Sequence, residues 1–490
     1  MLEPNLTLHI WILQCVVIFI SLLIIWVIFL SLRSRFHLRE IPMPPGHFIF
    51  GHLFDILDKE NQLIKFTKYA VKYDGIFKIY VPPTKASVIL TDPELIKILT
   101  TTQLDKPKDY LFLKNWFGHG LLTVPVKHWK RQRNMLTPHF NRFSQMAHFV
   151  KIFENYGDEL VAHLEGTSDG NIEMLPLMKW FAINSFCEIA FSQSKVFHEA
   201  YNHKYFESVE MLQKICVDRS TSMKRFDFWY KFTETFRQEW KALDTVNKLF
   251  EEIVEKKLEE QNENNANVEE YENFLDMLLK LRKENGLTIE HIRHEINTFL
   301  FAGHDTTSNG LAFTLYALSK NPKIQDKIFE EQSNILGDKV KVTYSDLQQM
   351  KYLESVVNES LRMYPPIPLI GRKVTKSMNL AGKYHLEKNQ NVGIFIYGCH
   401  HNPKYFPEPE KFIPERFLNG NAANSLMTFS YGPRTCIARK FAMLEMKSCI
   451  LKMVRKFHIL PPKPDENIHL YGSVVLRTLN PVRISLKKRI

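Results

Sequence analysis

Cysteine is scarce in this 490-residue chain, which has six, and no two of them form a Cys-x-x-Cys pair. The scattered spacing excludes a disulfide framework and the usual zinc sites, and it fits a reducing compartment. Glycine is also sparse, at 19 residues, and neither a Gly-x-Gly-x-x-Gly turn nor a Walker-type loop occurs. The chain therefore lacks the motifs with which proteins bind a nicotinamide or flavin cofactor or a nucleoside triphosphate.

A block of charge of one sign is absent as well. The 64 Lys and Arg residues outnumber the 53 Asp and Glu residues, which gives a net charge of +11 at pH 7, but both signs are spread along the chain. Such a surface suits an acidic protein or an anionic membrane. Because no nucleic-acid motif accompanies it, we predict no nucleic-acid partner.

One long hydrophobic run is present, in residues 8–32. About 25 positions without Lys, Arg, Asp or Glu can span a bilayer as one helix. The run exceeds a signal-peptide core and no small-x-small cleavage site follows, so we favour an uncleaved anchor, residues 1–32, over a signal peptide or a buried core helix. Arg33, Arg35 and Arg39 follow the run, which predicts a cytoplasmic C-terminal part on a single-pass anchor in the endoplasmic reticulum membrane.

The rest of the chain divides into a linker and one catalytic domain. Residues 33–46 are basic and rich in proline, which predicts a semi-rigid linker before a domain over residues 47–490. Strand-like runs occur at 76–80 and 86–90, and long helical patterns dominate from about residue 128. The polar stretch 259–273 predicts an exposed break. The expected fold class is mainly α with small β-sheets (α+β).

Cys436 lies in the segment FSYGPRTCIARKFA, residues 429–442. Apolar residues at helical spacing predict a helix from residue 437, so the helix dipole and the charge of Arg434 favour a thiolate. Gly432 permits a tight turn and Pro433 fixes φ. A thiolate presented in this way suits a bound iron, and a buried structural cysteine is the alternative interpretation.

This segment resembles the haem-binding loop of cytochrome P-450 monooxygenases, in which a cysteine thiolate is the axial ligand of the haem iron. The family pattern is matched at Phe429, Gly432, Arg434, Cys436 and Ala442. Ala438 departs from it, because the family usually has glycine there. The resemblance implies haem b as cofactor and a cytochrome P-450 fold, with a long central helix over the haem.

The longest helical pattern covers residues 287 to about 319, with Thr288 as the expected N-cap. Such a helix is roughly 45–50 Å long and can cross a whole domain. Its middle, residues 302–307, resembles the oxygen-activation motif of the family: Gly303 permits local distortion, Asp305 supplies an acid and Thr306 a hydroxyl. A stripe of small packing residues is the alternative, but it does not explain a carboxyl group in a buried helix.

Two more sets of residues match the family. Glu359, Arg362 and Arg416 resemble its salt-bridge triad, which implies a structural role in holding the cysteine loop. Haem propionates need cationic partners, and without the other motifs an amphipathic surface helix would explain the Trp-x-x-x-Arg stretch at 129–133. The cofactor contacts that the resemblance implies are Trp129, Arg133, Arg372, Phe429, Arg434 and Cys436.

Three stretches resemble the animal branch known as family four, in particular an insect member: Phe301 with Gly-His-Asp-Thr-Thr at 303–307, Leu-Ile-Gly-Arg at 369–372 and Phe-Ser-Tyr-Gly at 429–432. That branch implies a lipophilic substrate such as a fatty acid, a hormone or a xenobiotic. The candidate substrate contacts, each of which core packing would equally explain, are Phe112, Trp116, Phe117, Phe299, Ala302, Ile370 and Val474. Many members carry, at the position of Ala302, a glutamate that forms an ester to the haem, so we expect non-covalent haem here.

The expected function is a membrane-bound monooxygenase that inserts one oxygen atom of O2 into a lipophilic substrate. Because no cofactor motif for NADPH or flavin occurs, electrons must come from another protein. The expected donor is an NADPH-cytochrome reductase, and a cytochrome b-type protein is a further candidate donor. The alternatives are a haem-thiolate isomerase or dehydratase, against which Asp305 and Thr306 argue, and a catalytically silent haem- or lipid-binding protein. A non-haem structural protein is a further alternative.

Overall fold

The fold comes from a computed structural model of the chain, which describes all residues except 1–3, 37, 83, 141–142, 167–169, 194–198, 264–272, 421 and 490. Most of the predicted break at 259–273 therefore lies outside the described residues. Helices form most of the body, and four small sheets lie beside them. The predicted fold class, mainly α with small sheets, is confirmed.

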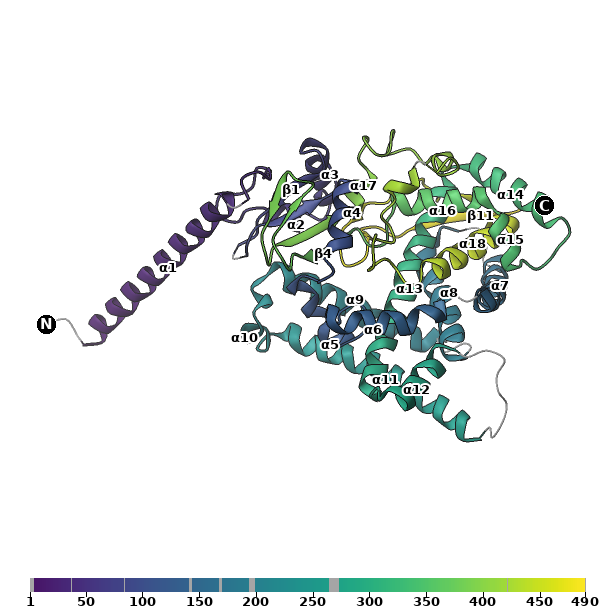
Figure 1. The fold of residues 1–490 in the computed structure, drawn as a ribbon, viewed down its shortest axis with the longest axis horizontal. Helices are drawn as coiled ribbons and strands as arrows, with labels where there is room; N and C mark the ends of the chain where they lie inside the picture. Colours follow the sequence, from purple (N-terminus) through teal and green to yellow (C-terminus); the bar gives the residue numbers. More distant parts are fainter. Residues whose placement is uncertain are drawn as a thin grey trace.

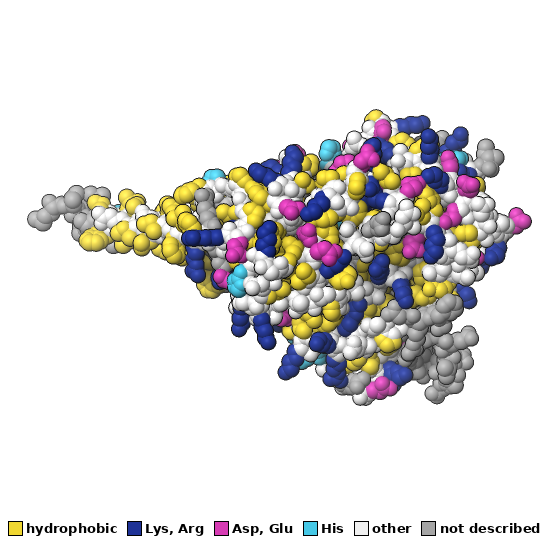
Figure 2. Space-filling view, turned by 45° about the horizontal axis from the view of Figure 1, so that its top comes forward, with side chains coloured by type: hydrophobic (Ala, Val, Ile, Leu, Met, Phe, Trp, Pro, Cys, Tyr) yellow, Lys and Arg dark blue, Asp and Glu magenta, His cyan; other side chains and the backbone are white. Residues whose placement is uncertain are grey.

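The first helix, α1 (Pro4–Phe36), projects away from the body (Figure 1). It contains the apolar stretch His9–Arg33, which is long enough to cross a membrane. Hydrophobic side chains cover this projection (Figure 2). The helix continues beyond the expected boundary at residue 32, and near its end the buried Ser31 donates a hydrogen bond to the carbonyl of Phe48 at 2.9 Å. The end of α1 is thus fixed to the domain by a side-chain contact.

The helices have lengths from one turn to more than eight turns. The α-helices of the body are α2 (Leu53–Leu57), α3 (Gln62–Lys72), α4 (Pro93–Thr102), α5 (Lys114–Phe117), α6 (Val126–Leu136), α7 (Phe143–Glu165), α8 (Met174–Phe191), α9 (Glu199–Thr221), α10 (Asp227–Tyr230), α11 (Glu234–Glu263), α12 (Phe274–Asn285), α13 (Ile289–Ser319), α14 (Pro322–Leu336), α15 (Tyr344–Gln349), α16 (Lys351–Met363), α17 (Ile396–His400) and α18 (Arg439–Lys456). The short 3-10 helices are η1 (Lys108–Leu113), η2 (Thr137–Phe140), η3 (Met223–Arg225), η4 (Pro414–Phe417) and η5 (Ala422–Ser425).

The largest sheet has the strand order β1-β2-β7-β4. Its strands are β1 (Ile76–Ile79), β2 (Ser87–Leu90), β4 (Leu369–Lys373) and β7 (Asn391–Phe395). Strand β2 runs parallel to β7, with Ile89 opposite Gly393, whereas β4 pairs with β7 in antiparallel fashion. The two strands expected from the N-terminal sequence are thus confirmed to within one residue.

Three smaller sheets complete the fold. They have the orders β3-β11-β8, β5-β6 and β10-β9. Their strands are β3 (Ile172–Glu173), β5 (Met378–Leu380), β6 (Tyr384–Leu386), β8 (Phe457–Leu460), β9 (Leu470–Tyr471), β10 (Arg477–Thr478) and β11 (Arg483–Lys488). The β9–β10 hairpin matters for the site because it carries Arg477 and, in its turn, Val474.

Helix α13 runs through the centre of the body (Figure 1) and packs along α8, α16 and α18. The Thr288 side chain caps its start by accepting from the amide of His291 at 3.2 Å, as predicted. The helix is unbroken at Gly303, so the expected local distortion is not seen. Close packing requires this glycine instead, because an added Cβ would lie 2.8 Å from the ring of Phe186 on α8.

Candidate active site

The loop before α18 presents Cys436. Ser430 and Gly432 have φ values of +62° and +76°, which turn the chain back on itself. The amide of Cys436 then donates to the carbonyl of Phe429 at 2.9 Å, which closes the loop. Gly432 is required here twice over, because its φ is left-handed and an added Cβ would lie 2.8 Å from the carbonyl oxygen of Thr100.

The surroundings of the Cys436 sulfur differ from the sequence-based expectation. Helix α18 begins at Arg439 rather than at residue 437, because residues 437–438 form a turn, so the sulfur does not cap the helix. Burial raises the pKa of the thiol. The amide of Ala438 and the charges of Arg133 and Arg439 lower the pKa by less, so the net shift is upward. The residue nevertheless keeps accessible surface. The Cys436 side chain is therefore accessible at the end of a fixed loop, where it could hold a bound iron.

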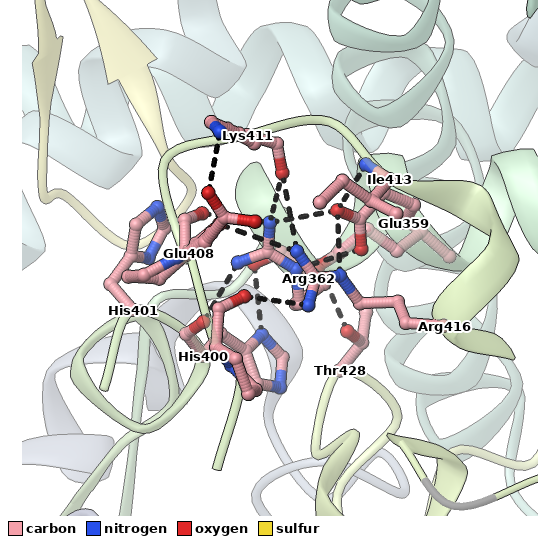
Figure 3. Close-up of polar contacts among 12 residues, drawn as sticks. Glu359, Arg362, His400, His401, Glu408, Lys411, Ile413, Arg416 and Thr428 are labelled. Carbon is pink, nitrogen blue, oxygen red and sulfur yellow. Dashed lines mark hydrogen bonds and ion pairs between the residues drawn. The ribbon is translucent and has the colours of Figure 1, made fainter. Parts of the chain in front are cut away.

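The predicted salt-bridge triad lies near Thr428, the residue that precedes this loop (Figure 3). Glu359 and Arg362 on α16 are fully buried and form a two-pronged ion pair at 2.8 and 2.9 Å. Arg416 on η4 reaches the same carboxylate at 3.2 Å. Each guanidinium also donates to backbone carbonyls, Arg362 to that of His400 and Arg416 to that of Pro407. The buried carboxylate of Glu359, paired with two guanidinium groups, therefore fixes α16 to η4.

His400 connects the triad to the cysteine loop, and sequence reasoning missed it. Its Nδ1 lies 3.1 Å from the carbonyl of Arg362 (Figure 3). Its Nε2 accepts from the amide of Met427 at 2.8 Å. Thr428 adds a bond to the carbonyl of Leu361 at 3.0 Å. Burial lowers the pKa of His400 well below its usual value, so the ring stays neutral and can accept at Nε2. A histidine one residue after a cysteine gives no sequence signal of this role.

Four basic side chains converge near the loop. Arg133 on α6 donates to the carbonyl of Thr435 at 2.8 Å, beside Cys436. Arg434 lies with its guanidinium 4.3 Å from the ring of Trp129 and donates to the carbonyl of Val124 at 3.3 Å. The group is completed by Arg372, from β4, and by Lys106, which the sequence did not reveal.

Arg372 is fully buried and the other three cations are half-buried, and among the described residues little negative charge lies beside them. Burial, followed by repulsion from Arg372, lowers the pKa of Arg434 to about 10, although Asp105 offsets part of the repulsion. Burial and the charges of Arg372 and Arg434 hold the pKa of Lys106 well below its usual value. Among the described residues, no group bonds the buried Nε atoms of Arg372 and Arg434. This donor set fits a dianion with two carboxylates, such as the propionates of haem.

The predicted oxygen-activation residues Asp305 and Thr306 face different sides of α13. Ala302 and Thr306 are accessible within a helix that is otherwise mostly buried, and the Thr306 hydroxyl donates to the carbonyl of Ala302 at 2.7 Å. Asp305 is fully buried and faces Arg477 of β10 at 2.9 Å. Burial raises the pKa of Asp305, but Arg477, His304 and Lys179 together lower it by more than burial raises it. The net shift of the pKa is therefore downward. Asp305 is therefore a paired carboxylate rather than a free acid.

The candidate substrate contacts fall into two groups. Trp116, Phe117 and Phe299 pack in aromatic clusters, with ring centroids 4.3 Å apart for Trp116 and Phe117 and 4.8 Å apart for Phe299 and Phe274. Their burial agrees with core packing. The residues that keep accessible surface, and so stay candidates, are Phe112, Ala302, Ile370 and Val474.

A cysteine loop fixed by a buried ion-pair network, beside unbalanced cations that suit propionates, defines a haem-thiolate protein. The family model for Cytochrome P450 matches residues 41–486, and the chain belongs to this family. It is thus a cytochrome P450 monooxygenase that uses haem b. The family assignment confirms the predicted resemblance to cytochrome P-450 monooxygenases and the expected fold.

Relatives place the chain beside one branch of the family. It is 33% identical over 478 residues to probable cytochrome P450 4s3 of Drosophila melanogaster, with 94% of each chain covered. It is 31% identical over 470 residues to cytochrome P450 4A24 of Sus scrofa, with 92% of each chain covered. A taurochenodeoxycholic 6 alpha-hydroxylase of Sus scrofa is also 31% identical over 468 residues, 92% of each chain. The predicted resemblance to family four is confirmed.

Proposed function

We propose that this cytochrome P450 is held in the endoplasmic reticulum membrane by α1 and hydroxylates a lipophilic substrate on the cytoplasmic side. It receives electrons from an NADPH-dependent flavoprotein reductase. The observation that carries the proposal is the accessible Cys436 side chain beside a cluster of cations, of which Arg372 is buried and Arg133, Arg434 and Lys106 are half-buried. That arrangement serves a bound haem, and α1 supplies the membrane attachment.

Each part of the site has a defined task. Cys436 would hold the iron and the cation cluster the propionates, and bound haem supplies the activation of O2 that side chains cannot perform. Thr306 presents a hydroxyl on the accessible side of α13 and Asp305 holds charge behind it. Ala302 has no carboxyl group, so the haem is held by Cys436 and non-covalent contacts alone. Acidified organic solvent should therefore extract all of the haem.

An exposed basic face supports a protein electron donor. Lys127, Lys130 and Arg131 are exposed on α6, and Arg439 and Lys440 are exposed at the start of α18. Arg133 of α6 donates to the carbonyl of Thr435 in the loop before α18, so exposed cations lie on both elements next to the loop that carries Cys436. Such a face attracts an acidic reductase domain, and turnover should weaken steeply as salt concentration rises.

The substrate class follows from the chemistry of the candidate contacts. Phe112, Ile370 and Val474 are apolar and half-buried, and Ala302 is small. A pocket of this kind binds a lipophilic molecule with few polar anchors. The relatives named above include a taurochenodeoxycholic 6 alpha-hydroxylase. We infer that the substrate is a fatty acid or another amphipathic lipid, with hormones and xenobiotics as further candidates.

The first experiment is the difference spectrum of the reduced full chain with and without carbon monoxide. A strongly red-shifted Soret band is expected for the wild type and none for Cys436→Ser, with circular dichroism to show that both are folded. The wild type in membranes with reductase and NADPH should then convert dodecanoic acid to a hydroxylated product. An imidazole-like band in the folded wild type would overturn the proposal, because the thiolate would not be the ligand.

A catalytically silent haem protein is distinguished by the second step. It would show the thiolate band but would consume no NADPH with any lipophilic probe. An isomerase or dehydratase would convert an organic peroxide without NADPH or reductase. Ala438, which stands where the family has glycine, still directs its amide to the Cys436 sulfur, so we expect the thiolate band to be retained.

A further inference from the structure

Three histidines from two segments meet at the start of α13. His119 lies in the loop between α5 and α6, and His291 and His294 lie near the start of α13. The ring centroid of His119 is 6.2 Å from that of His291 and 6.2 Å from that of His294. His119 and His291 are exposed, whereas His294 is buried. The haem site described above uses none of the three.

A carboxylate lies beside these rings. Oε1 of Glu290 is 3.8 Å from Nε2 of His294 and 3.9 Å from Nη2 of Arg293. Both separations are too long for a hydrogen bond. Zinc–ligand distances of about 2.0–2.2 Å place two donors of a tetrahedral site about 3.4 Å apart, so the gap between Nε2 and Oε1 suits a shared cation. We call His119, Glu290, His291 and His294 the histidine cluster.

The backbone of the α5–α6 loop is fixed closely over α13. Gly118 has φ +45°, and an added Cβ would overlap the ring of His294. An added Cβ at Gly120 would likewise overlap the hydroxyl of Thr298. Nε2 of Gln132 donates to the carbonyl of His119 at 2.9 Å. The main chain at His119 is therefore held against the helix, while its exposed ring is free to turn.

One ring of the cluster already has the second contact that metal-binding histidines usually make. Nδ1 of His291 lies 2.8 Å from Oγ1 of Thr288, which can accept from Nδ1–H and leave the lone pair on Nε2. No described group bonds the buried Nδ1 of His294. Because such an outer contact contributes about 10–100-fold in metal affinity, we expect a micromolar rather than a nanomolar Kd.

Two of the imidazoles are neutral at pH 7. Burial, followed by the charge of Lys114, lowers the pKa of His119. Burial, followed by the charge of Arg293, lowers the pKa of His294 to about 4, although Glu290 offsets part of the effect. A neutral imidazole binds a metal ion without first losing a proton. Imidazole nitrogens with one carboxylate oxygen are a donor set typical of Zn²⁺.

We propose that the histidine cluster is a site for Zn²⁺ or a similar divalent transition-metal ion, which ties the α5–α6 loop to α13. Among the described residues, no three His, Cys, Asp or Glu side chains already stand in metal-binding geometry, so the ion itself gathers the donors. Imidazoles on a tetrahedral ion have ring centroids about 5 Å apart, so the exposed His119 ring has to move by only about 1 Å. The site uses no haem ligand and does not depend on the proposed monooxygenase function.

The loop that the ion would hold also orients a cation of the haem site. The carbonyls of Leu121 and Val124 accept from Arg434 at 3.4 and 3.3 Å. The amide of Leu121 donates to Glu295 of α13 at 2.9 Å. A metal ion at the histidine cluster adds a further tie between this loop and α13. Its role is therefore to restrain the loop, not to take part in the chemistry at the iron.

The test uses the full haem-loaded chain in detergent, purified without a histidine tag and freed of metal ions with a chelator. Zn²⁺ is titrated in competition with a chromophoric chelator, for wild type, His119→Ala and His291→Ala. One ion per chain is expected for the wild type. Loss of a direct ligand should cost no less than loss of an outer contact, so each variant should bind at least about tenfold more weakly.

Melting temperatures give a second readout. Only the folded chain brings the α5–α6 loop to α13, so Zn²⁺ at 100-fold its Kd should raise the melting temperature of the wild type by about 2–4 °C. The melting temperature of His119→Ala should not change with Zn²⁺. The control is His385→Ala, which removes an exposed histidine of β6 whose Nδ1 lies 2.9 Å from Oδ1 of Asn379. It should bind Zn²⁺ as the wild type does.

The outcomes are distinct. Wild-type affinity in His119→Ala would overturn the inference, because the loop would then supply no ligand. An equal loss in His385→Ala would show capture by surface histidines in general and would overturn it as well. Should His291→Ala lose the cap contact to Thr288 and unfold, His119→Ala decides alone. A wild type that binds no Zn²⁺ but keeps its carbon monoxide band would refute the metal site and leave the proposed function standing.

Discussion

The guanidinium of Arg434 lies 4.3 Å from the ring centroid of Trp129, so the cation that precedes Cys436 by two residues rests on an indole from α6. Its hydrogen-bond acceptors are the backbone carbonyls of Leu121 and Val124, which carry no charge. The aromatic face and the carbonyls orient Arg434 without neutralising it. An orienting shell of this kind keeps the positive charge available to an anionic ligand.

Arg434→Gln should weaken haem retention. The variant loses a charged hydrogen bond worth about 1.5–3 kcal/mol, which corresponds to roughly ten- to a hundredfold in affinity. The ratio of haem to protein after gel filtration, and the rate of haem transfer to apomyoglobin, measure the loss. Arg293→Gln, which removes a cation 3.9 Å from Glu290 at the exposed start of α13, is the control and should retain haem as the wild type does. Equal transfer rates would contradict the role of Arg434 in propionate binding.

Glu359→Gln should destabilise the fold strongly. Arg362 is fully buried, and without the carboxylate its charge is uncompensated. Breaking a buried pair by removing one partner costs about 3–5 kcal/mol. Urea unfolding of the haem-loaded protein, followed by circular dichroism and by the Soret band, measures the change in the free energy of unfolding.

The matched control is Glu290→Gln. This pair has the same i, i+3 spacing, but Glu290 is 68% exposed and its carboxylate lies 3.9 Å from Arg293. An exposed pair contributes about 0–1 kcal/mol, so the control should unfold close to the wild-type urea concentration. A Glu359 variant as stable as the control would show that the triad does not support the cysteine loop.

The sequence allowed some of this site to be predicted and not the rest. Cys436 and the pair of Glu359 and Arg362 lie in short contiguous motifs, so their neighbours along the chain reveal them. Arg477 is 172 residues from Asp305 and comes from a two-residue strand, and no local pattern connects the two. Position-by-position patterns cannot show which distant side chain fills the space beside a buried carboxylate.

The predicted start of α18, at residue 437, was wrong for a local physical reason. The apolar spacing from residue 437 predicted a helix, but residues 437–438 form a turn that lets the amide of Ala438 bond to the Cys436 sulfur. Periodicity reports which face of a segment is buried, and it does not report a backbone amide diverted to a side chain. For the same reason the sequence did not reveal His400, whose two ring nitrogens contact the carbonyl of Arg362 and the amide of Met427.

Gly432→Ala should disrupt the cysteine loop. An alanine at φ +76° is strained, and its Cβ would lie 2.8 Å from the Thr100 carbonyl oxygen, which is backbone and cannot turn aside. We expect a loss of the thiolate-type carbon monoxide band and a fall in the melting temperature of about one to three degrees, since strain of this kind costs about 1–3 kcal/mol and the chain is large. Gly337→Ala is the control: it has φ +53° with no atom within 4 Å, so it carries the backbone strain without the clash and should keep the band.

Glu295 should make stability fall as pH rises through the neutral range. The residue is buried on α13 and accepts from the amide of Leu121 and from Gln132, each at 2.9 Å. Burial raises its pKa from 4.5 to about 8, although the Leu121 amide lowers it. A folded-state pKa above the unfolded value means that the folded protein binds the extra proton between about pH 4.5 and 8. The stabilisation is complete below that window and is lost as pH rises through about 8.

Glu295→Gln removes the ionisable carboxyl group and keeps the shape of the side chain. Its carbonyl oxygen can still accept from Leu121, so the variant should lose little stability at pH 6 and should lack most of the decline that the wild type shows up to pH 9. Urea midpoints at pH 6, 7, 8 and 9 measure this, with Glu234→Gln, an exposed glutamate on α11, as the control that keeps the wild-type slope. Because the Leu121 carbonyl accepts from Arg434 at 3.4 Å, ionisation of Glu295 should also loosen haem binding above pH 8. Parallel pH slopes in wild type and Glu295→Gln would show that another group carries the alkaline instability.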